Sequence, residues 1–445
     1  MRSFLRWLLG LILRIFFPRI EISNMARVPE RGPVILVVNH PNGLIDPLFL
    51  LCLSPRPVSF LAKAPLFSMP VIGWFVKALG SIPVYRRQDE GFVPEKNRQT
   101  FDRARAILVS GGVIAVFPEG ASHDDPRLRP LKTGAARIAL GATAASGTSE
   151  MPLTIAPMGI YYTAKGLFRS EALLYFGQPI TVAPILLEAD GEPPAGEVRL
   201  LTDRIEQALG DVTLQADEHE ALSLVARAER LFSANEPTSG EPLAQQFELR
   251  RRFLAGYSTL RARAPERLAA LIARINRYEA EASRAGVDRE TSTPPTSGIP
   301  GRAGSLLKTL ALSILALPVA VIGTIINYPA YRLVGFIATG LSRGDEGMVA
   351  TVKLLAGSLL FPVTWIAVAI AVGFYLGPIT GIASLIISAV SGYIALLFFE
   401  HMDEYRGVTN AILFSRFQRW GYLRLLAERR GIREEIVQLA EEFEQ

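Results

Sequence analysis

Short apolar runs alternate with longer amphipathic stretches between residues 20 and about 190. The runs are typical of buried strands, and they lie at 34–39, 57–62, 82–85, 113–117, 154–160 and 172–176. Helical patterns lie between them, notably at 95–110 and 131–145. Strands that alternate with helices imply a largely parallel sheet covered by helices on both faces. The pattern therefore predicts an α/β domain over residues 20–196.

A short amphipathic segment precedes this domain. The apolar run within residues 1–19 contains Trp7, is interrupted by Arg6 and Arg14 and ends at Pro18. The apolar run includes Arg14, and no small-residue cleavage site follows it, which argues against a signal peptide. We expect a helix in the membrane interface, with tryptophan in the headgroup layer and arginines on lipid phosphates. The alternative is a core helix of the α/β domain.

Residues 197–286 follow the α/β domain and are charged, and apolar positions recur at helical spacing within 241–283. This pattern predicts a helical region. Residues 287–304 are rich in proline, glycine and serine, which predicts a flexible linker and a domain boundary.

The longest apolar segments fill residues 305–400. Residues 351–376 and 379–399 are each long enough to cross about 30 Å of hydrocarbon. Only Gly377 and Pro378 separate them, which predicts a tight transmembrane hairpin. The chain is therefore expected to be an integral membrane protein with a C-terminal α-helical membrane domain.

The stretch 306–341 has an interrupted apolar pattern. Pro318 divides its first part, which ends at 327–329, and the remaining run is too short to span a bilayer. If 306–341 forms a re-entrant hairpin, every flanking basic residue is cytoplasmic, as the positive-inside rule favours. We therefore expect a re-entrant segment, cytoplasmic helices at 401–445, and an α/β domain on the cytoplasmic side.

Composition limits the partners of the chain. Hydrophobic residues make up 49% of it, and the formal net charge is +5. A basic balance combined with apolar segments favours anionic lipid and phosphorylated substrates over nucleic acid. Cys52 is the single cysteine, which excludes an internal disulfide and cysteine-based metal sites. Nothing in the sequence implies a metal or an organic cofactor.

The first apolar run ends in a histidine that is followed by an aspartate. His40 stands in a Pro-Asn-Gly turn, and Asp46 comes after five intervening residues. A carboxylate that reaches back to an imidazole fixes its tautomer and stabilises the imidazolium, which makes a general base. In the alternative interpretation Asp46 caps the following helix, with Pro47 in its first turn.

Three further blocks follow, and two of them carry polar residues at strand ends. Residues 80–86 end in Arg86, which we expect to bind a phosphate because a guanidinium binds phosphate bidentately; Lys63 is a second phosphate candidate. Residues 117–124 follow a buried strand and contain a carboxylate that is able to accept a hydrogen bond from a hydroxyl or to cap a helix. The pocket residues expected around this block are Glu119, Gly120, Ser122 and Lys132. His123 is a second candidate base, but its acidic neighbours indicate a solvated loop, so it ranks below His40. The last block is the strand 155–160.

Nothing in the sequence indicates a covalent nucleophile. The one Gly-x-Ser-x-Gly match, at 340–344, lies in the predicted membrane domain and not after a strand of the α/β domain, and Cys52 has no apparent partner. Direct attack by a substrate hydroxyl, with His40 as the base, is therefore expected over an acyl-enzyme.

The four blocks, in this order, resemble the motifs of the glycerolipid acyltransferase family. Those motifs are His-x4-Asp, Gly-x-Ile-x-x-x-Arg, Phe-Pro-Glu-Gly and an apolar strand with proline, and the resemblance covers residues 20–190. Five residues separate His40 from Asp46 here. The branch that includes the fungal-type glycerol-3-phosphate and dihydroxyacetone-phosphate acyltransferases also has five, and it resembles this chain in the third block and the distal membrane hairpin.

The resemblance implies a membrane-bound O-acyltransferase with a glycerol-phosphate acyltransferase-like sheet. The expected reaction moves a fatty acyl group from acyl-CoA or acyl carrier protein to the sn-1 hydroxyl of glycerol 3-phosphate or dihydroxyacetone phosphate. His40 would be the base and Asp46 its orienting group, while the third block would help bind the acceptor. The alternatives are sn-2 acylation of lysophosphatidate and a non-catalytic lipid-binding scaffold.

Overall fold

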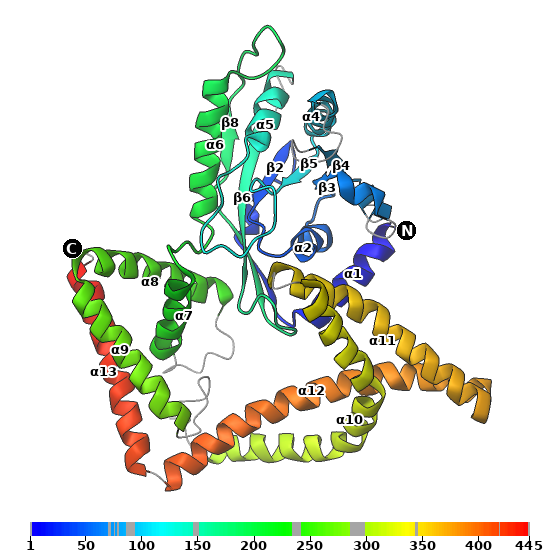
Figure 1. Cartoon of the computed structure of the whole chain (residues 1–445), viewed down its shortest axis with the longest axis vertical. Coiled ribbons are helices and arrows are strands. Elements are labelled where there is room, and N and C mark those ends of the chain that lie inside the picture. The colour runs from blue at the N-terminus through cyan, green and yellow to red at the C-terminus, as the bar shows by residue number, and fades with distance from the viewer. Residues whose placement is uncertain are drawn as a thin grey trace. The chain divides into compact units, whose positions relative to one another are not determined.

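The computed structural model describes residues 2–69, 73–74, 76–77, 80–85, 94–145, 151–233, 242–284, 299–342, 346–417 and 419–443. The chain divides into two compact units, whose elements are labelled in Figure 1. The sheet unit comprises Met1–Asp217 together with Ala338–Leu354. The helical unit comprises Glu218–Ile337 together with Leu355–Gln445.

The sheet unit contains the predicted strands and helices and two strands that the pattern did not predict. Its strands are β1 (Ile20–Ser23), β2 (Val34–Val38), β3 (Val58–Lys63), β4 (Ile82–Val84), β5 (Val113–Val116), β6 (Leu153–Tyr162), β7 (Ala172–Phe176) and β8 (Ile180–Val182). Its helices are α1 (Arg2–Phe16), α2 (Ile45–Leu53), α4 (Pro94–Val109), α5 (Gly134–Ala145) and α6 (Ala195–Gly210). The unpredicted strands are β1 and β8, which are short and lack a long apolar run.

The described strands form one mixed sheet in the order β1-β7-β6-β2-β5-β3-β4, with β8 beside β6. Strand β2 lies near the middle and is parallel to both β5 and β6. The β6–β7 pair is antiparallel, because a short loop without a helix connects these strands and cannot make a parallel crossover. The sheet is therefore less uniformly parallel than the alternation predicts. Because β2 and β5 run in register, the residues that follow them meet at one edge of the sheet.

Both faces of the sheet are buried, as the apolar runs predict. In β2, Leu36 and Val38 belong to the core shared with α1 and α2, whereas Ile35 and Val37 belong to the core shared with α4, α5 and α6. Side chains that alternate between two buried faces explain why this strand has no polar position.

Helix α1 has two different faces. Leu9, Leu13 and Phe16 are buried in the core of the sheet unit, as the alternative interpretation expects. Phe4 and Trp7 are exposed on the other side and stack on each other. The inner face anchors the helix, while contact of the outer face with a membrane interface stays a prediction.

Helix α6 places the domain boundary later than the sequence pattern does. Val198, Leu201 and Ile205 of this helix are buried in the core against the sheet. The continuous part of the sheet unit extends to Asp217, whereas the sequence pattern ends the α/β domain at residue 196. The charged outer face of α6 concealed its apolar stripe.

In the helical unit, four helices share a third core. They are α7 (His219–Ser233), α8 (Leu243–Arg263), α9 (Pro265–Arg284) and α13 (Arg419–Phe443). Arg274 of α9 also forms ion pairs with Glu428 and Glu435 of α13, each at 2.7 Å. Helix α13 therefore packs against a helix that lies far earlier in the chain.

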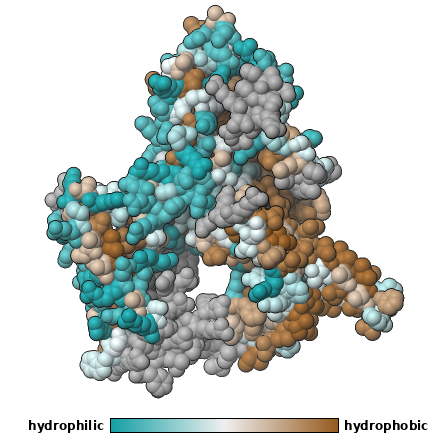
Figure 2. Space-filling view, viewed as in Figure 1, coloured by the Kyte–Doolittle hydropathy of each residue, from teal (hydrophilic) through white to brown (hydrophobic). Residues whose placement is uncertain are grey.

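Among the described residues, three helices are long and apolar enough to cross a membrane. They are α10 (Ile299–Ser342), α11 (Glu346–Leu376) and α12 (Pro378–Phe417). Helices α11 and α12 form the predicted hairpin, although α12 continues beyond its expected end at 399. Figure 2 shows hydrophobic residues gathered over α11.

The stretch 306–341 lies within one helix, α10, which contains Pro318 and Pro329 and follows a bent path (Figure 1), and its re-entrant path in a membrane stays a prediction. Helix α10 begins within the expected linker 287–304, of which 287–298 lies outside the described residues. Asn327 in its middle donates to the Ser388 carbonyl of α12 and accepts from Trp365 of α11. This buried asparagine joins the three apolar helices, which explains a polar residue at that position.

Candidate active site

His40 and Asp46 form a hydrogen-bonded pair at the carboxyl end of β2. His40 Nδ1 lies 2.8 Å from Asp46 Oδ2 across the turn that leads into α2. The imidazole is 15% exposed, and the carboxylate is completely buried. Because Nδ1 is engaged by the carboxylate, Nε2 is the nitrogen that is able to take a proton from a bound molecule. The longer spacing between the two residues thus still allows direct contact.

Asp46 accepts two further hydrogen bonds. The backbone N–H of Asn42 donates to Oδ2 at 2.7 Å, and the Tyr162 hydroxyl donates to Oδ1 at 2.5 Å. Asp46 is the second residue of α2 rather than its cap, and its carboxylate points back into the turn. The capping alternative therefore does not describe this residue.

Burial has the largest effect on the pKa of the Asp46 carboxyl group. It raises the pKa of Asp46 above the ordinary carboxyl value, while the bonds from His40, Tyr162 and Asn42 act in the opposite direction. Burial and the neighbouring carboxylate raise the pKa of Tyr162 well above its usual value. Tyr162 therefore keeps its proton and remains a donor to Asp46.

The His40 ring is held from the neighbouring strand. Phe117, which follows β5, stacks on the imidazole with ring centroids 4.2 Å apart. The backbone N–H of His40 donates to Glu119 Oε1 at 3.1 Å. These two contacts restrict rotation of the ring, because they fix both its face and its backbone attachment.

Glu119 joins the first and third blocks. Its Oε2 accepts the backbone N–H of Arg129 at 3.0 Å and contacts His123 Nε2. His123 is 7% exposed, so it is buried against Glu119 rather than solvated as its acidic neighbours suggested. Both oxygens of Glu119 thus hold the loop, and a contact of this carboxylate with an acceptor hydroxyl stays a prediction.

The remaining predicted residues of the third block lie around the same loop. Gly120 has φ +78°, a left-handed conformation that favours glycine, and a Cβ added there would lie 3.7 Å from Lys132 Cγ. Lys132 is exposed, and its backbone N–H donates to the Pro118 carbonyl. A Cβ added at Gly43 would lie 3.8 Å from Ser122 Oγ, which places Ser122 beside the turn after His40.

Of the two predicted phosphate ligands, only Lys63 lies among the described residues. Lys63 is half-buried at the end of β3, opposite Val84 of β4. Arg86 lies outside the described residues, so its position relative to His40 is not defined. Both assignments stay predictions.

Cys52 stands in the last part of α2, and burial raises the pKa of its thiol to about 11. The thiol is therefore protonated near neutral pH and is a poor nucleophile.

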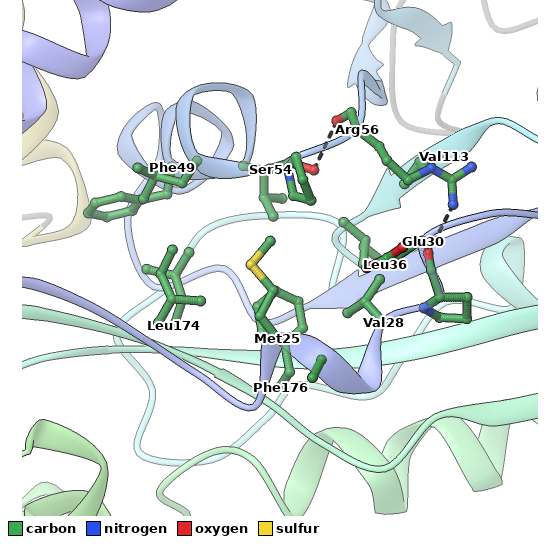
Figure 3. Close-up of a pocket in the computed structure, with 16 residues that line it drawn as sticks. Met25, Val28, Glu30, Leu36, Phe49, Ser54, Arg56, Val113, Leu174 and Phe176 are labelled. Carbon is green, nitrogen blue, oxygen red and sulfur yellow. Dashed lines mark hydrogen bonds between the residues drawn. The ribbon is translucent and has the colours of Figure 1, made fainter.

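An apolar cavity of about 510 Å³ lies between α2 and the sheet (Figure 3). Leu36, Phe49, Leu174 and Phe176 are among its lining residues. Arg56 stands at its edge and donates to the Pro29 carbonyl. None of the described residues predicted for the site lines this cavity, so the cavity and the His40–Asp46 pair are separate features of the sheet unit.

Two contributing residues were not predicted from the sequence. Tyr162 ends β6, two residues beyond the fourth block, and reaches Asp46 from there. Asn39 exchanges hydrogen bonds with the backbone N–H and C=O of Ile160, which fixes the end of β2 against β6. Both stand beside predicted blocks, but their bonding partners are distant in the sequence. Spacing along the chain therefore does not predict these contacts.

Comparison with known proteins identifies related sequences. The family model described as Acyltransferase matches residues 19–161. Glycerol-3-phosphate O-acyltransferase 1 of Saccharomyces cerevisiae is 25% identical, over 99% of this chain and 71% of its own length. Glycerol-3-phosphate O-acyltransferase 2 of the same yeast is 37% identical over 36% of this chain. Other relatives, 25–31% identical, are named 1-acyl-sn-glycerol-3-phosphate acyltransferases.

Coverage differs among these relatives. The chain spans 21% of the length of the second yeast protein. It is 27% identical to an uncharacterised acyltransferase of Schizosaccharomyces pombe, over 57% of this chain and 49% of that protein. Among solved structures, the 1-acyl-sn-glycerophosphate acyltransferase of Thermotoga maritima matches 47% of this chain and 79% of its own, with 17% identity and a TM-score of 0.33.

Proposed function

We propose, from the match of residues 19–161 to the acyltransferase family model, that the chain is a membrane-bound glycerolipid O-acyltransferase. It transfers a fatty acyl group from acyl-CoA or acyl carrier protein to the sn-1 hydroxyl of glycerol 3-phosphate or dihydroxyacetone phosphate. The observation that carries the proposal is the His40–Asp46 pair, in which Nδ1 is bonded to a buried carboxylate and Nε2 faces away from it.

The reaction follows from this geometry. His40 Nε2 takes the proton of the acceptor hydroxyl as its oxygen attacks the thioester carbonyl. The new C–O bond forms, the C–S bond breaks, and the leaving thiolate receives the proton from the imidazolium. Asp46 stabilises the imidazolium between these two steps. The raised thiol pKa of Cys52 is consistent with direct transfer without an acyl-enzyme, and no cofactor beyond the acyl donor is required.

Two observations favour a glycerol-phosphate acceptor. The five-residue spacing between His40 and Asp46 resembles the fungal-type branch, and the yeast relative aligned over 99% of this chain is named a glycerol-3-phosphate O-acyltransferase. Lysophosphatidate is the second candidate acceptor, because several relatives are named for its acylation. The phosphate group common to these acceptors suits the cationic candidates Lys63 and Arg86.

The acceptor is tested by an assay of the purified full chain in lipid nanodiscs. Labelled acyl-CoA or acyl carrier protein is offered with glycerol 3-phosphate, dihydroxyacetone phosphate or lysophosphatidate, and the lipid products are separated. We expect labelled lysophosphatidate from glycerol 3-phosphate at a kcat/KM at least about tenfold above that for lysophosphatidate, since one well-bound group accounts for such a ratio. Higher efficiency with lysophosphatidate would establish the sn-2 alternative. Lipid binding without transfer to any acceptor would support the scaffold.

The proposal places the sheet unit and the C-terminal helix on the cytoplasmic side. Helix α9 precedes α10, and α13 follows α12, yet α9 and α13 share a core and ion pairs, so both lie on one side of a membrane. If α11 and α12 cross and return, α10 must begin and end on that same side. The bend in α10 and the basic residues near its ends support a re-entrant path under the positive-inside rule.

This topology is tested by labelling single cysteines in a Cys52→Ser background with a membrane-impermeant maleimide. The sites are Ala189→Cys in the sheet unit, Gln438→Cys in α13 and Tyr375→Cys at the end of α11, all of which are exposed. In sealed vesicles of one orientation, we expect the first two to label together and the third only after the membrane is opened. Labelling of Ala189→Cys and Gln438→Cys from opposite sides of the membrane would contradict the proposed topology.

A further inference from the structure

The first turns of α11 are part of the sheet unit, although the candidate membrane span of this helix, Met348–Leu376, begins within them. Ala350 is completely buried and Leu354 is 5% exposed, and both belong to the core that includes Ile45 and Phe49 of α2. The unit division accordingly assigns Ala338–Leu354 to the sheet unit. The start of α11 is therefore packed beside the helix that carries Asp46.

Thr351 of α11 bonds directly to the turn between His40 and Asp46. Its Oγ1 accepts the backbone N–H of Leu44 at 3.1 Å and lies 3.4 Å from Asn42 Oδ1, to which the hydroxyl donates. Leu44 is the N-cap residue of α2, and no side chain of that helix caps its start. Backbone N–H groups at a helix start lack partners within the helix, so Thr351 supplies one from outside.

The backbone of the turn has other partners, among them the His123 N–H, which donates to the His40 carbonyl at 3.2 Å, so the Thr351 contact bears chiefly on the Asn42 side chain. Asn42 is completely buried, and its Nδ2 has no hydrogen-bond partner within the described part of the chain. The hydroxyl of Thr351 is therefore the side-chain contact that orients the Asn42 amide. The backbone N–H of the same asparagine donates to Asp46, so the orientation of Asn42 and that of the carboxylate are coupled.

Neighbouring residues fix α11 against the site. A Cβ added at Gly43 would lie 3.5 Å from Met348 Sδ and 3.5 Å from Thr351 Oγ1, so the helix approaches the backbone of the turn closely. Lys353 Nζ donates to the Gly166 carbonyl at 2.8 Å, in the loop that follows Tyr162. Helix α11 thus contacts both the turn after β2 and the loop after β6.

We infer that Thr351 is a positioning residue for the His40–Asp46 pair. It holds the five-residue turn in the shape that brings the carboxylate to the imidazole, and α11 thereby connects the catalytic geometry to a helix that continues as a candidate membrane span. The expected change in kcat rests on the proposed function. The expected change in how readily His40 is modified rests on the structure alone.

The test compares two substitutions at one position with a matched control on the same helix. Thr351→Val removes the hydroxyl at constant shape, whereas Thr351→Ser retains it. The control is Thr364→Val, because the Thr364 hydroxyl donates only within its own helix, to the Leu360 carbonyl at 2.9 Å. All are measured as full chains in nanodiscs. We expect Thr351→Val to lower kcat about tenfold with KM for the acceptor and the donor within about twofold, and Thr351→Ser and Thr364→Val to stay within about twofold of the parent in kcat.

A second readout does not depend on turnover. Diethyl pyrocarbonate modifies the imidazole, and peptide mass spectrometry follows the rate at His40 separately from the other histidines. We expect Thr351→Val to raise that rate about threefold over the parent, with Thr351→Ser and Thr364→Val unchanged, because a loosened turn opens more often. If the parent protein transferred no acyl group, the proposed function would be wrong, but the rate of His40 modification would still test the role of Thr351. An unchanged rate and kcat in Thr351→Val, or equal losses in Thr351→Ser, would overturn the inference.

Discussion

Replacing His40 with alanine is expected to lower kcat by about a thousandfold, with little change in KM for the phosphorylated acceptor. A positioned general base contributes about 10² to 10⁴ in rate, and no other described histidine combines a carboxylate partner with a place at the end of β2. The structure gives His40 no role in holding a phosphate, so binding of the acceptor persists. The measurement is steady-state transfer of a labelled acyl group at several acceptor concentrations.

The matched control for this variant is His219→Ala, which removes an exposed histidine at the start of α7 in the helical unit. It is expected to retain the parental kcat. Near-normal turnover in His40→Ala would show that another group takes the proton, and His123, which is buried against Glu119, would then be the next histidine to replace.

Asp46→Asn is expected to lower kcat by about a hundredfold or more. Asparagine retains the shape of the side chain but removes the charge that stabilises the imidazolium. An amide nitrogen turned toward His40 also favours the tautomer with the proton on Nε2, the nitrogen that must accept it. Because the side chain is completely buried, water cannot replace the lost carboxylate. Initial rates at saturating acceptor and donor check this expectation.

Tyr162→Phe provides a graded comparison, since it removes one of the three hydrogen bonds to Asp46 and leaves the charge. Its expected loss is about tenfold in kcat, in line with one hydrogen bond to a buried charged group. Asp203→Asn on the exposed face of α6 is the control and should behave as the parent. If Asp46→Asn lost no more activity than Tyr162→Phe, the negative charge would not matter and Asp46 would serve only to hold the turn.

Much of the site was predictable because it follows local rules. The buried runs at 34–39 and 113–117 predict strands, and parallel neighbours bring the residues after them to one edge of the sheet. His40 and Glu119 each follow such a run, so both stand at that edge. Their bond, from the His40 backbone N–H to Glu119 Oε1, shows how close the two blocks come.

Other features depend on packing that the local pattern does not contain. The apolar stripe of α6 was hidden by its charged face, and the prolines of α10 suggested a break where the helix only bends. Prolines interrupt isolated helices strongly, whereas contacts such as those of Asn327 with α11 and α12 stabilise this one.

The sequence by itself determined the α/β order, the two long apolar segments after residue 350, and the histidine and aspartate at the end of β2. These depend on periodicity and on the residue types that chemistry requires. Only the tertiary structure decided what holds that pair. Tyr162 lies 116 residues from Asp46, and Thr351 lies 307 residues from Leu44. Contacts over such separations arise when whole elements pack, because the hydrophobic burial that brings them together is distributed over many residues and leaves no local signature.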